Sequence, residues 1–106
     1  MAKKYRVLIT KIAEEDIRYI FEYILSDNPQ AAERWKGEIK SQIASLKEFP
    51  ARCSIIPEAV VIGIDYRHVI YGDYRTVFKI TDDAVFIMRV FHCGKLLIWD
   101  IWKINL

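Results

Sequence analysis

Hydrophobic residues recur at helical spacing in the first half of the chain, after a short β-prone run at residues 5–9. That run, Tyr-Arg-Val-Leu-Ile, is predicted as the opening strand. Thr10 is suited to cap a helix, and acidic residues follow near its positive end. The apolar stripe of this helix consists of Ala13, Ile17, Ile20, Phe21 and Ile24. The pattern predicts an amphipathic helix that ends at residues 26–29.

A second helix follows almost at once. Asn28 is suited to cap it, and Pro29 occupies the first turn, where its missing N–H costs nothing. One face carries the apolar residues Ala32, Trp35, Ile39, Ile43 and Leu46, with Trp35 predicted as a core anchor. The helix should stop near Phe49-Pro50. Because the connection is so short, the two helices are predicted to form an antiparallel hairpin. Residues 51–65 are predicted as a loop.

The remaining sequence alternates at strand spacing. Strands are predicted over 66–71, 74–80 and 84–91, separated by turns at 72–73 and 81–83. In the last strand, strict alternation leaves one face apolar up to His92 and places Arg89 on the other. The predicted fold class is α+β in the order β-α-α-β-β-β. It comprises an N-terminal strand, an antiparallel helical hairpin and an antiparallel β-meander, in one twisted sheet with the helices on one face.

Composition fits a single domain over residues 1–106, with 53% hydrophobic residues and a net charge of only +2. With so small a net charge, anion binding must come from local clustering. The acids gather in the helical half and the bases in the meander. These bases are Arg67, His68, Arg75, Lys79, Arg89, His92 and Lys95. A sheet with this set of bases is suited to meet phosphate or carboxylate.

Other features narrow the class of protein. Cys53 and Cys93 suit a reduced protein better than a disulfide scaffold. The apolar run at the N-terminus is too short for a signal peptide, and no stretch is long enough for a membrane span, so we expect a soluble cytoplasmic domain. No glycine loop could cradle a phosphate. The cysteines and histidines lack the paired spacing of zinc ligands, so no cofactor is expected.

The order of motifs identifies a resemblance. Y-R-V-x-I-T is followed by Y-I-x-x-D-N-P-x-A-A, then Y-R-x-V-x-Y-G-D-Y-R-x-V-F-x-I, then V-x-I-x-R-V-F-H. Together these motifs, from about Tyr5 to His92, resemble the RelE/ParE superfamily of toxins from type II toxin–antitoxin (plasmid stabilization) modules. The Ile24 to Ala32 stretch and the long hairpin look closer to the ParE branch. The resemblance implies a small bacterial toxin that a co-expressed antitoxin neutralises by lying along its surface.

The superfamily divides by mechanism. ParE-like members poison DNA gyrase and are not nucleases, whereas RelE-like members enter the ribosomal A site and cut mRNA. The resemblance places Arg75 at the family's sheet arginine and Arg67 at a base of the preceding strand. His92 and Lys95 stand where many members read H-x-x-R. Lys95 thus replaces an arginine, and a lysine binds phosphate as a point charge rather than as a bidentate fork.

RNA cleavage through the 2′-hydroxyl requires a proton acceptor, a donor for the leaving oxygen and cationic stabilisation of the phosphorane. His92 or His68 could move protons near neutral pH, and Arg67, Arg75 and Lys95 could stabilise the charge. The catalytic candidates for a RelE-like enzyme are therefore Arg67, Arg75, His92 and Lys95. The structural interpretation of the same residues is ion-paired strand arginines and a hydrogen-bonded histidine.

Three functions remain open from sequence. A ParE-like gyrase inhibitor is favoured by the long hairpin, the low net charge and the H-x-x-K ending. A ribosome-dependent mRNA endonuclease is favoured by the set of Arg67, Arg75 and His92. The third is a toxin-fold protein that only binds its partner. The expected partners are a cognate antitoxin and either gyrase or the ribosome with its mRNA, but no membrane.

The C-terminal stretch is strongly apolar. Leu97, Ile98, Ile101 and Trp102 share one helical face. Because a large exposed apolar patch usually marks an interface, this face is predicted to dock the antitoxin or a second toxin chain in a homodimer. The alternative is a last strand or helix that completes the core.

Overall fold

The structure is a computed structural model that describes residues 3–94. In chain order its elements are β1 (Arg6–Ile9), α1 (Lys11–Asp27), α2 (Pro29–Ser45), η1 (Pro50–Arg52), α3 (Ala59–Ile62), β2 (Arg67–Tyr71), β3 (Tyr74–Ile80) and β4 (Ala84–His92). The four strands form one sheet in the order β1-β4-β3-β2. β1 runs parallel to β4, and the other pairs are antiparallel. The predicted α+β arrangement is confirmed.

Both predicted helix caps are present. The hydroxyl of Thr10 accepts a hydrogen bond from the backbone N–H of Ala13 at 3.2 Å, and the Asn28 side chain accepts from that of Ala31 at 3.1 Å. These caps satisfy N–H groups that have no partner within their own helix. α2 ends at Ser45, earlier than predicted, and the chain then pairs with the residues just before β1. The carbonyl of Lys47 accepts from the N–H of Tyr5 at 2.8 Å.

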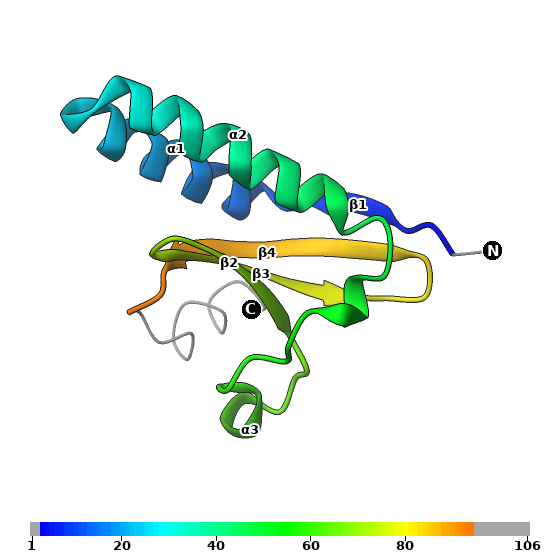
Figure 1. Cartoon of the computed structure of the whole chain (residues 1–106). Coiled ribbons are helices and arrows are strands. Elements are labelled where there is room, and N and C mark those ends of the chain that lie inside the picture. Colours follow the sequence, from blue (N-terminus) through cyan, green and yellow to red (C-terminus); the bar gives the residue numbers. More distant parts are fainter. Residues whose placement is uncertain (1–2, 95–106) are drawn as a thin grey trace.

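The two long helices lie side by side on one face of the sheet, here called the hairpin face (Figure 1). The main core lies between them and the sheet, and comprises Ala13, Ile20, Trp35, Ile39, Ile43, Leu46, Phe78, Val85, Ile87 and Val90. Trp35 is 5% exposed, and its ring meets the edge of Tyr74 with centroids 5.6 Å apart. The role of Trp35 as a core anchor is confirmed. Removal of this apolar surface from water is the main stabilising contribution to the fold.

The predicted loop 51–65 has structure of its own. It includes the last two residues of η1 and all of α3, and α3 lies on the opposite side of the sheet from the two long helices (Figure 1). We call residues 54–66 the α3 segment and the face that it covers the α3 face. A smaller core forms there from Ile56, Ala59, Ile62, Tyr66, Val77, Met88 and Phe91. The segment is tied to the sheet by the N–H of His68, which donates to the carbonyl of Ser54 at 3.1 Å.

A β-bulge in β4 changes which side chains face the helices. Val77 pairs with Arg89 but the next residue, Phe78, pairs with Ile87, so Met88 is the extra residue. Before the bulge Ile87 faces the main core, and after it Val90 does. The predicted strict alternation along this strand is therefore wrong, because one inserted residue moves each later side chain to the other face.

Candidate functional site

Arg75 and His68 lie together on the α3 face. Arg75 pairs with Phe91 of β4, and His68 pairs with Val77 of β3. Directly opposed residues of neighbouring strands share a face. Both Phe91 and Val77 belong to the smaller core on that side of the sheet. The structure thus brings together two of the predicted bases.

Arg67 and His92 lie on the other side of the sheet. Arg67 pairs with Phe78, which belongs to the main core, and His92 pairs with Tyr74, which packs against it. The sheet therefore separates both residues from Arg75. Arg67, Arg75 and His92 do not meet at one point in space.

Arg75 is held by a carboxylate that the sequence did not indicate. Its Nη1 donates to Oε1 of Glu58 at 3.2 Å, and its Nη2 donates to Oε2 of the same residue. The side chains of Arg75 and Glu58 are only 7% and 9% exposed. The Arg75 guanidinium also lies 4.9 Å from the centre of the Phe91 ring. Glu58 lies seventeen residues before Arg75, in the predicted loop, so no local pattern links the two.

The imidazole of His68 completes this cluster. Its Nδ1 lies 3.3 Å from Nη1 of Arg75. Burial lowers the pKa of His68, the positive charge of Arg75 lowers it further, and Glu58 partly offsets both effects. His68 is therefore neutral at neutral pH, with Nδ1 placed to accept a hydrogen bond from Arg75. A neutral imidazole could accept a proton from a substrate whose phosphate is bound by the neighbouring guanidinium. In this structure, however, the guanidinium already binds the carboxylate of Glu58.

Arg67 anchors the loop that follows η1. Its Nη1 donates to the carbonyl of Cys53 at 2.5 Å and to that of Ala51 at 3.3 Å. Burial raises the pKa of the Cys53 thiol, although the nearby charges of Arg52 and Arg67 oppose this effect. The Cys53 sulfur is therefore a protonated thiol at neutral pH rather than a nucleophilic thiolate.

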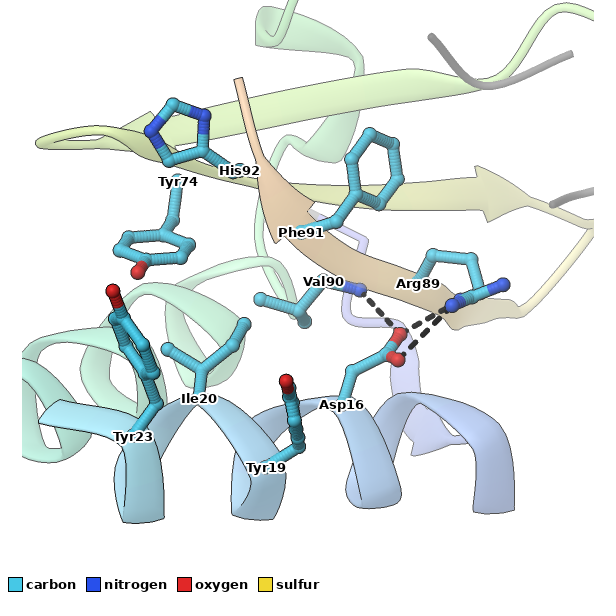
Figure 2. A pocket seen from close by; sticks show the side chains of 9 residues that line it. All are labelled: Asp16, Tyr19, Ile20, Tyr23, Tyr74, Arg89, Val90, Phe91 and His92. Carbon is cyan, nitrogen blue, oxygen red and sulfur yellow. Dashed lines mark hydrogen bonds and ion pairs between the residues drawn. The ribbon is translucent and has the colours of Figure 1, made fainter. Parts of the chain in front are cut away.

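A cleft of about 270 Å³ opens on the hairpin face, between α1 and the end of β4 (Figure 2). It is lined by Asp16, Tyr19, Ile20, Tyr23, Tyr74, Arg89, Val90, Phe91 and His92. His92 Nδ1 accepts from the N–H of Gly94 at 3.0 Å, and the His92 ring meets that of Tyr74 edge-on at 5.6 Å. Burial raises the pKa of Tyr74, so its hydroxyl stays protonated. The cleft is therefore an aromatic recess with one imidazole at its rim.

The floor of the cleft is fixed by Asp16 of α1. Its carboxylate accepts from Nε of Arg89 at 2.7 Å, from Nη2 at 3.1 Å and from the backbone N–H of Val90 at 3.0 Å (Figure 2). These bonds tie the first helix to the bulge of β4. Arg89 therefore serves as a structural link in this position.

A second hollow, here called the β1 groove, lies where β1 meets the helical hairpin. It measures about 550 Å³ and is lined by Val7, Ile9, Glu14, Ile17, Arg18, Phe21, Lys36, Lys40, Ile43 and Ala44. Its floor is apolar, and three of its four charged residues are cationic. β1 is an edge strand of the sheet. The β1 groove therefore offers an apolar surface with a basic rim.

Residues 7–97 match the family described as "ParE toxin of type II toxin-antitoxin system, parDE". The chain belongs to the ParE toxin family. It is thus a toxin of a type II toxin–antitoxin system, and the predicted relationship to the RelE/ParE superfamily is confirmed. No curated protein matches this ParE-family sequence.

Two solved structures share the fold of this ParE-family chain. One is described as the chromosomal ParDE TA system from P. aeruginosa. It has a TM-score of 0.66 and 14% identity, covering 84% of this chain and 96% of that chain. The other is the RelBE2 toxin–antitoxin complex from Mycobacterium tuberculosis. It has a TM-score of 0.58 and 20% identity, covering 85% of this chain and 92% of that chain.

Some predicted residues of this ParE-family chain lie outside the described range. They are Lys95, from the catalytic set, and the predicted interface residues Leu97, Ile98, Ile101 and Trp102. Within residues 3–94, no three His, Cys, Asp or Glu side chains are grouped so as to hold a metal ion. None of the helices over the same residues has the length and apolar character needed to cross a membrane.

Proposed function

We propose that this chain is a ParE-like toxin that inhibits DNA gyrase by binding to it in the cytoplasm, and that a cognate antitoxin neutralises it. The observation that carries this proposal is the separation of the bases required for RNA cleavage. Arg75 lies on the α3 face and is bound by Glu58, whereas Arg67 and His92 lie on the other side of the sheet. Inhibition by binding needs no such constellation.

An mRNA endonuclease is the second candidate, and one contact favours it. His68 lies 3.3 Å from Arg75, so a neutral imidazole and a guanidinium are already adjacent. Cleavage would also need a phosphate within hydrogen-bond reach of both groups. In this structure the carboxylate of Glu58 binds the guanidinium that such a phosphate would require.

The test is controlled expression of the toxin in a bacterial host, with two measurements from one culture. We expect gyrase-dependent DNA breaks and altered plasmid supercoiling while abundant mRNAs remain intact by primer extension. The purified protein should also inhibit supercoiling by purified gyrase. The variants His68→Gln and His92→Gln, one on each side of the sheet, should retain full toxicity.

Other results would overturn the gyrase proposal. Codon-phased mRNA cuts that vanish in the His68→Gln variant would establish the endonuclease and place its chemistry on the α3 face. Cuts that vanish only in the His92→Gln variant would place it in the aromatic cleft. A lack of any growth defect, together with antitoxin binding, would leave a protein that only binds its partner.

The β1 groove supports the neutralisation part of the proposal. Its apolar floor and the cations Arg18, Lys36 and Lys40 fit an amphipathic antitoxin segment that carries acidic side chains. Lys36 also lies 4.9 Å from the centre of the Phe21 ring, which places its charge over the apolar floor. We also propose that the C-terminal residues, which lie outside the described range, contact the antitoxin or a second toxin chain; these residues are Leu97, Ile98, Ile101 and Trp102.

A charge reversal tests the groove. The double variant Lys36→Glu and Lys40→Glu should slow antitoxin association about tenfold or more, and added salt should reduce the difference. The matched control is Arg34→Glu with Lys47→Glu, which changes the net charge equally at exposed positions outside the groove lining. Equal losses of association rate in both double variants would show that the effect comes from net charge and not from the groove.

Deletion of residues 97–106 tests the C-terminal part. The truncated protein should stay folded and lose antitoxin binding. Unfolding of the truncated protein would instead assign these residues to the core.

A further inference from the structure

The cluster around Arg75 has the features of a site built for an anion. The planar guanidinium presents two parallel N–H groups to Glu58, which is the geometry by which arginine binds carboxylates and phosphates. It is oriented from two other sides by the Phe91 ring and the His68 imidazole. An arginine cannot discharge by losing its proton, so at 7% side-chain exposure it requires an anion in this position.

The anion comes from a segment outside the sheet. Glu58 stands at the N-cap position of α3, yet its side chain makes no capping hydrogen bond there. Its carboxylate instead reaches across to Arg75 of β3. The side chain therefore gives up its local role in α3 and neutralises a charge on the sheet.

The α3 segment is held over this position by apolar contacts. Ile56, Ala59 and Ile62 pack into the smaller core, whereas Val60 and Val61 point outward and are 92% and 68% exposed. The N–H of Ile56 donates to the carbonyl of Tyr66 at 2.9 Å, which closes the segment on itself. The carboxylate is thus delivered by a compact cover that has its own contacts with the sheet.

We infer that Arg75 and His68 form an oxyanion site, of the class that binds a carboxylate or a phosphate, and that the α3 segment closes this site by placing Glu58 in it. The inference is independent of the gyrase target, because it concerns only the chemistry of the α3 face. It implies that a small oxyanion can take the place of the Glu58 carboxylate when that carboxylate is removed.

The first test is rescue of the Glu58→Ala variant by small anions. This variant leaves the buried Arg75 guanidinium without the Glu58 carboxylate, and it leaves space there for a small carboxylate. Acetate, formate or phosphate should then raise the Tm progressively, since each binds only the folded protein. We expect a rise of ~4 °C or more in about 0.5 M acetate relative to chloride at equal ionic strength. The wild type should show a smaller rise, which measures the general effect of each anion on protein stability and is subtracted.

Two further variants decide the outcome. The double variant Glu58→Ala with Arg75→Met should lose the response, because methionine fills a similar volume without charge. Glu58→Gln keeps the shape of the side chain and should respond in the same direction but less strongly. If Glu58→Ala does not fold in chloride, recovery of folded protein by refolding in acetate replaces the Tm as the measurement.

The expected and contrary results are distinct. A response to acetate and formate alone would define a carboxylate-sized site, and an added response to phosphate would extend it to phosphate esters. The inference is overturned if Glu58→Ala and Glu58→Gln respond to none of the three anions more than the wild type. It is equally overturned if the double variant that lacks Arg75 responds as strongly as Glu58→Ala.

Discussion

Two arginine–carboxylate pairs attach segments that lie on opposite faces of the sheet, and the pairs differ in burial. In the pair that joins α1 to β4, Asp16 and Arg89 are 17% and 18% exposed. On the α3 face, Glu58 and Arg75 are 9% and 7% exposed. Each pair joins a carboxylate from outside the sheet to an arginine on a strand. Both are ion pairs between an arginine and a carboxylate, but water has less access to the pair of Glu58 and Arg75.

The partners of the two carboxylates also differ. Asp16 accepts hydrogen bonds from Arg89 and from the backbone N–H of Val90. It therefore neutralises the charge of Arg89 and also binds the backbone next to the β4 bulge. Glu58 accepts from both terminal nitrogens of Arg75, and the arginine also contacts His68 and Phe91. Loss of one partner from the deeper pair leaves a charge that water cannot reach. The depth of burial, more than the hydrogen-bond geometry, therefore determines how far the free energy of unfolding falls when one partner of a pair is removed.

The largest effect should come from breaking the deeper pair on one side only. Arg75→Met strands the Glu58 carboxylate in the smaller core and should lower the free energy of unfolding by about 3–5 kcal/mol. The double variant Arg75→Met with Glu58→Gln should recover part of this loss, because no buried charge remains. Urea unfolding of the wild type, both single variants and the double variant measures the coupling. Additive losses would show that the two side chains are not coupled.

A smaller loss is expected on the hairpin face. Asp16→Asn removes the negative charge and replaces one of the two carboxylate oxygens, both of which accept from Arg89, by an NH₂ group that cannot accept a hydrogen bond. The free energy of unfolding should fall by about 1.5–3 kcal/mol, the usual contribution of a hydrogen bond to a charged group. Amide hydrogen exchange at Val90 should become faster. The control Glu15→Gln neutralises an exposed acid one residue away on the same helix and should have little effect.

The proposed dependence on burial would be contradicted if Asp16→Asn lowered the free energy of unfolding as much as Arg75→Met. The contact with the bulge, rather than the burial of charge, would then contribute most to the stability of the sheet.

The predictions that succeeded rest on signals contained within a few residues. Thr10 and Asn28 are recognisable as caps because a cap and the N–H that it satisfies lie within one helical turn. The apolar stripes of both helices and the turn at residues 72–73 have the same local character. The predicted strands of the meander lie within one residue of the observed ones for the same reason.

The features that could not be predicted depend on contacts across the chain. Glu58 stands in a segment without periodicity, and only the folded chain brings it to Arg75. The bulge at Met88 leaves no mark in the alternating pattern of β4, yet it turns the side chain of Val90 toward the main core. The resemblance offered Arg67, Arg75 and His92 as catalytic candidates for a RelE-like enzyme, and the pleat places Arg75 on the opposite face from the other two. Face assignment requires the strand register, which the sequence does not specify.

The smallest expected effect is on the pH dependence of stability. It involves only the cluster that contains the deeper pair, through His68. Burial and the charge of Arg75 lower the pKa of His68 in the folded protein, with Glu58 opposing them, whereas the unfolded chain keeps a value near 6.5. Well above pH 6.5 the imidazole is neutral in both states and contributes nothing to the pH dependence of stability. As the pH falls through 6.5, the unfolded chain takes up the proton first. Stability should therefore decrease toward the lower folded pKa.

His68→Gln should remove this dependence, because glutamine cannot titrate but can still accept a hydrogen bond from Arg75. We expect the free energy of unfolding, measured in urea between about pH 5.5 and 7.5, to fall less steeply with acid in this variant than in the wild type. His92→Gln serves as the matched control, since that histidine is exposed on the other side of the sheet. Identical slopes for His68→Gln and the wild type would contradict the assignment. A flattened slope in His68→Gln alone would place the pH sensitivity in the cluster on the α3 face, because no histidine takes part in the hydrogen bonds that join Asp16 to β4.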